Sequence, residues 1–232
     1  MQMDSSDLKL SEHWPNYSLL SSLIKMSKDY PEVNWPYALS TGQIISKIWI
    51  IETLRALKVE NLGSVMVLGG WVGLLGHILL SEKSLQIEKI RSFDIDPICE
   101  KIADMMNVNF VSKQWKFKAS CSDWNSLNYD ETQYTVHRLK DFGEVPLNDR
   151  FDTIINTCCE HVSGFENWIV RIPSDRLLIL QSNSSSEFEG HVNCHPSLDV
   201  FKVQVGLNRV LFEGSLDAGE YKRWMLIGYR NV

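Results

Sequence analysis

The sequence has no basic run, no Cys-x-x-Cys pair and no long apolar segment. Its 23 basic and 29 acidic residues give a net charge of −6, whereas a duplex nucleic-acid binder shows clustered Lys and Arg. Five scattered cysteines argue against a disulfide framework or a zinc ribbon. No stretch approaches the roughly 18 consecutive apolar residues of a membrane helix, and the N-terminal region has no signal-peptide core. We therefore expect a cytoplasmic protein with no nucleic-acid or membrane partner; the sequence indicates no oligomeric state.

What the sequence does contain is enough apolar material for one large domain, at 44% of 232 residues. Its most informative stretch, residues 64–76, is Ser-Val-Met-Val-Leu-Gly-Gly-Trp-Val-Gly-Leu-Leu-Gly. The continuous apolar run from Val65 to Leu68 is typical of a strand that is buried on both faces of a parallel sheet. Glycines follow at positions 69, 70, 73 and 76, where an apolar helix begins. The pattern predicts a strand, a tight turn and a helix whose first N–H groups face a ligand.

An acidic residue stands where a nucleoside-binding turn requires one, at the end of the next predicted strand. Asp94 follows the glycines by roughly 20 residues, the spacing at which a carboxylate accepts hydrogen bonds from ribose hydroxyls. A glycine turn alone is weak evidence, because helix caps and loops also use glycine. The turn, the Asp94 strand and a helix from Pro97 to Met106 occur in the order of a complete nucleoside-binding unit.

Two segments, Val-Met-Val-Leu-Gly-Gly-Trp-Val-Gly and Phe-Asp-Ile-Asp-Pro, resemble the first two motifs of the class I S-adenosylmethionine-dependent methyltransferases. The resemblance covers roughly residues 60–232 and implies S-adenosylmethionine as cofactor. It also implies an α/β fold: a Rossmann-like, mostly parallel seven-stranded sheet with a C-terminal antiparallel hairpin. Two positions depart from the family pattern, because Val67 replaces an acidic residue and Trp71 replaces the middle glycine. Another group must therefore orient the methionine end of the cofactor.

The resemblance also implies which residues bind the cofactor. The glycine turn would surround its amino-acid and ribose portions through Gly69, Gly70, Trp71 and Gly73. Asp94 would bind the ribose, with Ile95 beside it. In the family, an acidic side chain after the third strand commonly binds the adenine amine while a neighbour packs on the ring, and Asp123 and Trp124 are the candidates. A helix-capping Asp and a core Trp explain this pair equally well.

Residues 1–60 precede the first sheet strand, and we expect them to form a helical cap over the cofactor crevice. Apolar spacing predicts helices from Ser18 to Met26 and from Gly42 to Leu57, the second capped by Ser40 or Thr41. Residues 61–232 form the cofactor-binding domain, with an inserted hairpin at about 128–149. The remaining strands are predicted at Trp115–Cys121, Asp152–Ile155, Arg176–Gln181, Arg209–Glu213 and Tyr221–Tyr229.

Polar side chains that are suited to catalysis follow the fourth predicted strand. Asn156, Glu160 and His161 should lie at the carboxyl edge of the sheet, where open α/β proteins place their chemistry. We interpret Asn156 as a cofactor-binding and catalytic group. Glu160 and His161 would orient an acceptor or remove its proton. The alternative is a helix N-terminal turn, in which Glu160 is favoured by the helix dipole and His161 is surface.

Metal binding is not expected. Four residues of metal-ligating type lie close together in the sequence: Glu189, His191, Cys194 and His195. Structural zinc sites use four ligands in recognisable pairs, and no second pair stands at a matching distance. We expect this stretch to form one wall of the acceptor pocket.

The predicted function is methyl transfer from S-adenosylmethionine to a small-molecule acceptor. Any carbon on a sulfonium reacts with a nucleophile that is held in line with it. Intramolecular closure to azetidine-2-carboxylate, with release of methylthioadenosine, is therefore an alternative. A non-catalytic S-adenosylmethionine-binding regulator and a nicotinamide-dependent oxidoreductase are further alternatives, although Trp71 would crowd a pyrophosphate.

Overall fold

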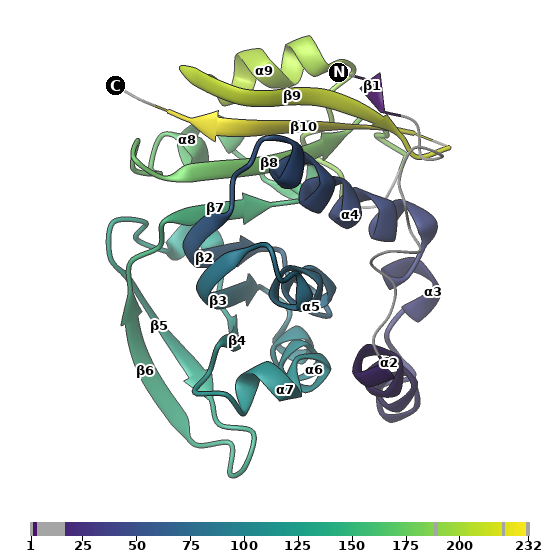
Figure 1. The fold of residues 1–232 in the computed structure, drawn as a ribbon, viewed down its shortest axis with the longest axis vertical. Helices are drawn as coiled ribbons and strands as arrows, with labels where there is room; N and C mark the ends of the chain where they lie inside the picture. The colour runs from purple at the N-terminus through teal and green to yellow at the C-terminus, as the bar shows by residue number, and fades with distance from the viewer. Residues whose placement is uncertain (1, 4–16, 188–189, 220, 231–232) are drawn as a thin grey trace.

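The computed structural model describes residues 2–3, 17–187, 190–219 and 221–230. Its centre is a twisted sheet in the order β1-β9-β10-β8-β7-β2-β3-β4 (Figure 1). The sheet strands are β1 (Gln2–Met3), β2 (Asn61–Leu68), β3 (Gln86–Asp94), β4 (Phe117–Cys121), β7 (Thr153–Asn156), β8 (Leu177–Asn183), β9 (Arg209–Asp217) and β10 (Lys222–Tyr229). The helices are α2 (Tyr17–Asp29), α3 (Trp35–Ala38), α4 (Thr41–Ala56), α5 (Leu74–Ser81), α6 (Pro97–Met106), α7 (Val108–Val111), α8 (Phe165–Ile169) and α9 (Leu198–Val205), with short 3-10 turns η2 (Trp124–Ser126) and η3 (Cys159–His161).

The pairing of the strands confirms the predicted Rossmann-like sheet. Strands β4, β3, β2, β7 and β8 are parallel neighbours, and β10 runs antiparallel between β8 and β9. The structure adds β1, which pairs in parallel with β9 and which the sequence analysis did not predict. Strand β9 also runs farther than expected, to Asp217, because Leu216 is fully buried and pairs with Arg223 of β10.

Both faces of the sheet are covered, as the unbroken apolar run in β2 requires. Val65 and Val67 pack into one core with residues of α4 and α5, whereas Met66 and Leu68 pack into a second core with residues of α8 and α9. Successive side chains of a strand point to opposite faces, so the run fills both cores. No helix among the described residues is long and apolar enough to cross a membrane.

An antiparallel hairpin precedes β7. It consists of β5 (Thr132–His137) and β6 (Glu144–Asp149), which form a separate two-stranded sheet within the described part of the chain. Tyr134 and Val136 of β5 are buried in the second core. Arg91 of β3 donates from Nε to the Tyr134 hydroxyl over 2.8 Å, so the hairpin is fastened to the sheet at a buried polar contact.

The N-terminal helices lie along one side of the sheet domain (Figure 1). Ser40 caps α4 as predicted, since its hydroxyl accepts a hydrogen bond from the Gln43 N–H. Trp35 of α3 and Met26 of α2 share a third core with Ile102 and Met106 of α6. Helix α4 is buried around most of its circumference and packs in the same core as Val65 and Val67 of β2.

The turn after β2 is packed too tightly for a side chain at Gly70, where a Cβ would lie 1.8 Å from the Ser92 hydroxyl oxygen. We expect Gly70→Ala to lower the free energy of unfolding by about 1–3 kcal/mol, the usual cost of overpacking. Adding Ser92→Ala removes the clashing oxygen, so the double variant should recover most of that loss. Urea unfolding of the two single variants and the double variant measures this coupling. Strictly additive losses would contradict the described packing.

Candidate functional site

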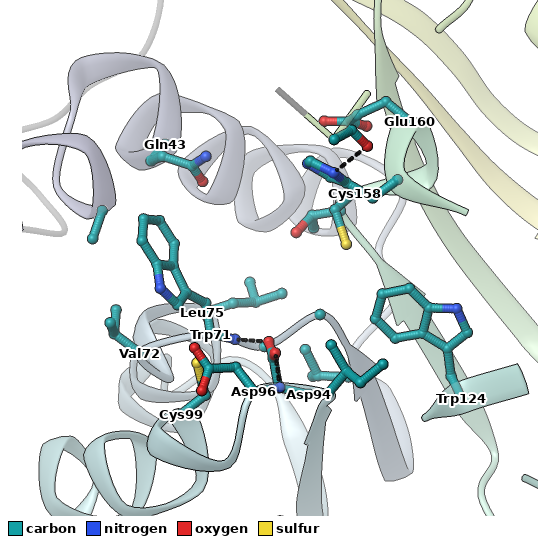
Figure 2. Close-up of a pocket in the computed structure, with 18 of the residues that line it drawn as sticks. Gln43, Trp71, Val72, Leu75, Asp94, Asp96, Cys99, Trp124, Cys158 and Glu160 are labelled. Carbon is teal, nitrogen blue, oxygen red and sulfur yellow. Dashed lines mark hydrogen bonds between the residues drawn. The ribbon is translucent and has the colours of Figure 1, made fainter. Parts of the chain in front are cut away.

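A cavity of about 540 Å³ lies at the carboxyl ends of the central strands (Figure 2). Ligands of open α/β sheets bind at this edge. Its walls come mainly from the turn after β2, the end of β3, the segments that follow β4, β7 and β8, helices α3 and α4, and β10. The principal lining residues are Tyr37, Gln43, Lys47, Gly69, Gly70, Trp71, Asp94, Ile95, Asp96, Asp123, Trp124, Cys158, Glu160, His161 and Arg223.

The glycine turn forms the floor of the cavity and is held by the end of β3. The backbone N–H groups of Gly69 and Gly70 donate to the Phe93 carbonyl oxygen at 2.9 and 3.2 Å. The Trp71 N–H donates to Asp94 Oδ2 at 2.9 Å. Gly69 has φ +63° and Trp71 has φ +45°, a region that non-glycine residues rarely adopt. The hydrogen bond to Asp94 stabilises this unusual backbone at Trp71.

Asp94 therefore has a fixed carboxylate in the cavity. Its Oδ1 accepts a hydrogen bond from the Asp96 N–H over 3.1 Å while Oδ2 accepts that of Trp71. Burial raises the pKa of Asp94, and the two backbone donors oppose that rise by favouring the charged form. Asp96 caps α6, because its Oδ1 accepts a hydrogen bond from the Ile98 N–H.

Gly73 lies outside the lining of the cavity. It precedes α5 with φ +79°, and a Cβ there would lie 2.9 Å from the Ala103 Cα of α6. Asn107 donates to the Gly73 carbonyl oxygen over 3.0 Å. The position is thus occupied by glycine because two helices meet at it, and the turn brings Gly69, Gly70 and Trp71, but not Gly73, to the cavity.

The sequence left open whether Asp123 and Trp124 are a helix cap and a core residue or part of the cofactor site, and the structure is compatible with both. Asp123 caps the short turn η2 by accepting from the Asn125 N–H at 2.8 Å, and its side chain also lines the cavity. Figure 2 shows Trp124 across the cavity from Trp71. The benzo edge of the Trp124 indole faces the glycine turn, with Cζ3 3.5 Å from the position of a Cβ at Gly69, so the indole can cover a ring that lies in the cavity.

The cavity is also lined by two buried cationic side chains that the sequence did not indicate as site residues. Lys47 of α4 donates from Nζ to Gln43 Oε1 at 2.7 Å, and burial lowers the pKa of Lys47 to about 7. Arg223 of β10 donates to the Thr157 carbonyl oxygen at 2.8 Å and lies 3.5 Å from Glu160 Oε1. A lysine inside the apolar run Ile-Ile-Ser-Lys-Ile-Trp-Ile was the available signal. These cations can bind an anionic group such as a carboxylate.

The three predicted catalytic residues are divided by the structure. Glu160 and His161 line the cavity. Asn156 is fully buried, is absent from the lining, and accepts a hydrogen bond from the Cys158 N–H at Oδ1 over 2.9 Å. Glu160 Oε1 accepts a hydrogen bond from Asn183 Nδ2 over 2.7 Å. Asn156 thus shapes the loop after β7, while Glu160 and His161 face the space in which a ligand would lie.

Cys99 and Cys158 both line the cavity, and Cys158 is the one that packs against the glycine turn. Its sulfur would lie 2.2 Å from a Cβ at Gly69, which shows how closely the two segments pack. Burial raises the pKa of the Cys158 thiol well above its ordinary range. Because the thiolate is the nucleophilic form, the environment of Cys158 does not favour covalent catalysis. The cysteines within the described residues form no disulfide.

No family model and no curated protein matches the chain. Solved structures match it over most of its length. The magnesium protoporphyrin IX methyltransferase ChlM of Synechocystis PCC 6803, with bound SAH, is 15% identical; the match covers 93% of this chain and 97% of that one, with a TM-score of 0.57. The N-methyltransferase NodS of Bradyrhizobium japonicum WM9 is 11% identical over 84% of this chain and 98% of its own, with a TM-score of 0.55. The [4+2]-cyclase SpnF is 11% identical over 100% and 98% of the two chains, with a TM-score of 0.58.

These likenesses show that the chain has the fold of the class I S-adenosylmethionine-dependent methyltransferases, as its two motifs implied. Identities of this size show the fold and leave the reaction to be argued from the site. The same fold occurs in the small RNA methyltransferase HEN1, of which the match covers 25%, at 15% identity and a TM-score of 0.54.

The buried Lys47 should be costly for the fold, and the cost should depend on pH. Its pKa is about 7 in the folded chain and near 10.4 when unfolded, so the unfolded chain binds the proton more tightly. The penalty is full below about pH 7 and disappears as pH rises towards 10.4. We expect Lys47→Met to raise the free energy of unfolding by up to about 4 kcal/mol at pH 7.

Urea titrations at pH 6, 7, 8 and 9 would measure this effect against Lys28→Met, a change at an exposed lysine of α2. The gain from Lys47→Met should shrink as pH rises, and the control should give no such trend. An equal gain at every pH would show that Lys47 is not held in the low-pKa environment described.

Proposed function

We propose that this chain is an S-adenosylmethionine-dependent methyltransferase that acts on a small-molecule acceptor. The observation that carries the proposal is the fixed carboxylate of Asp94 beside the glycine turn, inside a cavity of a class I methyltransferase fold. A half-buried carboxylate in the lining of the cavity is suited to accept hydrogen bonds from two ribose hydroxyls.

The other ends of the cofactor find complementary groups in the same cavity. Asp123 and Trp124 are suited to bind the adenine amine and to cover the ring. Lys47 and Arg223 supply positive charge for the methionine carboxylate. They replace the orienting function that Val67 cannot perform, and Lys47 comes from α4 in the region that we expected to act as a cap. The division into a cap of residues 1–60 and a cofactor domain of residues 61–232 is part of the proposal.

Methyl transfer requires an in-line nucleophile in a site that excludes water. Glu160 and His161 line the cavity, Glu160 beside Arg223, and are suited to orient an acceptor and to take its proton. Asn156 acts as a positioning residue, because its Oδ1 accepts a hydrogen bond from the Cys158 N–H in the loop that carries Glu160. A cavity of about 540 Å³ falls within the range of small-molecule sites.

Replacing Asp94 by Asn should weaken S-adenosylmethionine binding. Loss of charge-assisted bonds to ribose hydroxyls costs about 1.5–3 kcal/mol, which is a 10- to 150-fold rise in Kd. Asp96→Asn is the matched control, because Asp96 also lines the cavity but uses its carboxylate to cap α6. Isothermal titration of both variants, with melting temperatures to verify folding, measures the difference. Equal losses of affinity would contradict the assignment of the ribose to Asp94.

The reaction is tested by product analysis. Incubation with S-adenosylmethionine alone should leave the cofactor intact, because the proposed nucleophile is an external acceptor. A cell extract is separated into small-molecule, RNA and protein fractions, and each fraction is incubated with the protein and methyl-labelled cofactor. S-adenosylhomocysteine and a labelled product should form with the small-molecule fraction. Methylthioadenosine formed without an acceptor would contradict methyl transfer and indicate cyclisation. Label in RNA would contradict the acceptor class, and binding of a dinucleotide in place of S-adenosylmethionine would contradict the cofactor.

A further inference from the structure

Three metal-ligating side chains meet at the wall of the cavity: Glu160, His161 and His191. One ligand atom from each lies within 4.8 Å of the others. Glu160 and His161 belong to η3 after β7, and His191 belongs to the loop after β8. The sequence pattern did not indicate this group, because its members come from two strand ends about 30 residues apart. Of the possible metal ligands named in the sequence analysis, His191 belongs to this group, whereas Cys194 and His195 do not. Glu189 lies outside the described residues.

The two segments are fixed to each other by backbone hydrogen bonds. The N–H groups of Val192 and Asn193 both donate to the Glu160 carbonyl oxygen at 2.9 Å. The Asn193 side chain also donates to the Cys159 carbonyl oxygen at 3.2 Å. His191 is therefore held beside Glu160 by its immediate neighbours in the chain. Tetrahedral ligands at about 2.1 Å from an ion stand about 3.4 Å apart, so small side-chain rotations bring the three groups to ligating distance.

Each imidazole is oriented by a carbonyl oxygen. His161 Nδ1 lies 2.9 Å from the Gly190 oxygen, and His191 Nδ1 lies 2.6 Å from the Ser185 oxygen. A carbonyl oxygen only accepts, so in each neutral ring Nδ1 carries the proton and Nε2 carries the lone pair. Metal-binding histidines show this arrangement, in which one ring nitrogen donates to a backbone carbonyl and the other binds the ion. The two rings lie nearly perpendicular, with centroids 4.6 Å apart.

Glu160 provides an independent indication that a cation binds here. The residue is only 2% exposed, and Oε2 has no hydrogen-bond partner among the described residues. Its other oxygen is engaged by Asn183 Nδ2 at 2.7 Å and lies 3.5 Å from the Arg223 guanidinium. Burying an unpartnered carboxylate oxygen is costly. A cation beside Oε2 would remove that cost, and the groups on Oε1 would orient the carboxylate towards it.

From these contacts we propose that Glu160, His161 and His191 bind a divalent first-row transition-metal ion. Two imidazoles and one carboxylate select such an ion over Mg²⁺ or Ca²⁺, which prefer all-oxygen sites. Three protein ligands leave a coordination position open, as in catalytic rather than structural sites. Because Glu160 and His161 line the cavity, that position would take water or an acceptor oxygen or nitrogen, and with the ion bound the two side chains would act on the acceptor through the ion and not as bases. This use of the ion rests on the proposed function, whereas binding of the ion does not.

The test uses the tag-free, full-length protein after removal of metal with a chelator. Titration with Co²⁺ should give visible d–d absorption that saturates at one ion per chain and is displaced by Zn²⁺, with a rise in melting temperature. His161→Gln and His191→Gln, both at positions that are not buried, should each weaken Co²⁺ binding about 10-fold or more, the range known for lesser changes around metal sites. His137→Asn on the hairpin is the control and should bind Co²⁺ as the parent does.

Absence of Co²⁺ and Zn²⁺ binding, or binding that both glutamine variants retain, would overturn the proposal. Folding of each variant is verified by its melting temperature without metal. S-adenosylmethionine affinity is measured on the same metal-free sample, so the two proposals fail separately. Loss of metal binding with cofactor binding intact removes only the metal site, and the converse removes only the proposed function.

Discussion

The site depends on one constraint: the turn after β2 must bend back onto the end of β3. Its backbone N–H groups reach the Phe93 carbonyl oxygen and the Asp94 carboxylate, and only residues with little or no side chain fit between Ser92 and Cys158. The same contacts fix the position of Asp94 at the floor of the cavity. The glycines are therefore required by the packing of the turn itself, and the ability to bind a nucleoside follows from where that packing leaves the Asp94 carboxylate.

The second determinant is charge. Burying Lys47, Arg223 and Glu160 around one cavity is unfavourable unless each has a partner. Arg223 and Glu160 approach each other, whereas Lys47 donates to the neutral Gln43 side chain, which leaves its charge costly to bury. One oxygen of Glu160 has no partner among the described residues. Such an arrangement is suited to a ligand with a negatively charged end, and the remaining demand of Glu160 for a cation connects the two proposals for this cavity.

Much of the fold was predictable because its signals are local. The apolar run into glycines, the Asp94 strand and the α6 helix with its Asp96 cap all lie within residues 64–106. Lys47 and Arg223 were not predictable as parts of one site, because they reach it from α4 and β10. Only the tertiary packing of these elements brings them together. The periodicity of apolar residues identifies each helix or strand, but it does not show which of its polar residues faces the cavity.

The central claim is that S-adenosylmethionine binds on the glycine turn with its ribose on Asp94. A crystal structure of the protein with S-adenosylhomocysteine tests it most directly. The account predicts both ribose hydroxyls within hydrogen-bond distance of the Asp94 carboxylate, the adenine beside Trp124, and the amino-acid carboxylate near Lys47 or Arg223. A nucleoside bound elsewhere, for example at the opposite edge of the sheet around Asn61 and Asp152, with Asp94 contacting only backbone, would contradict it.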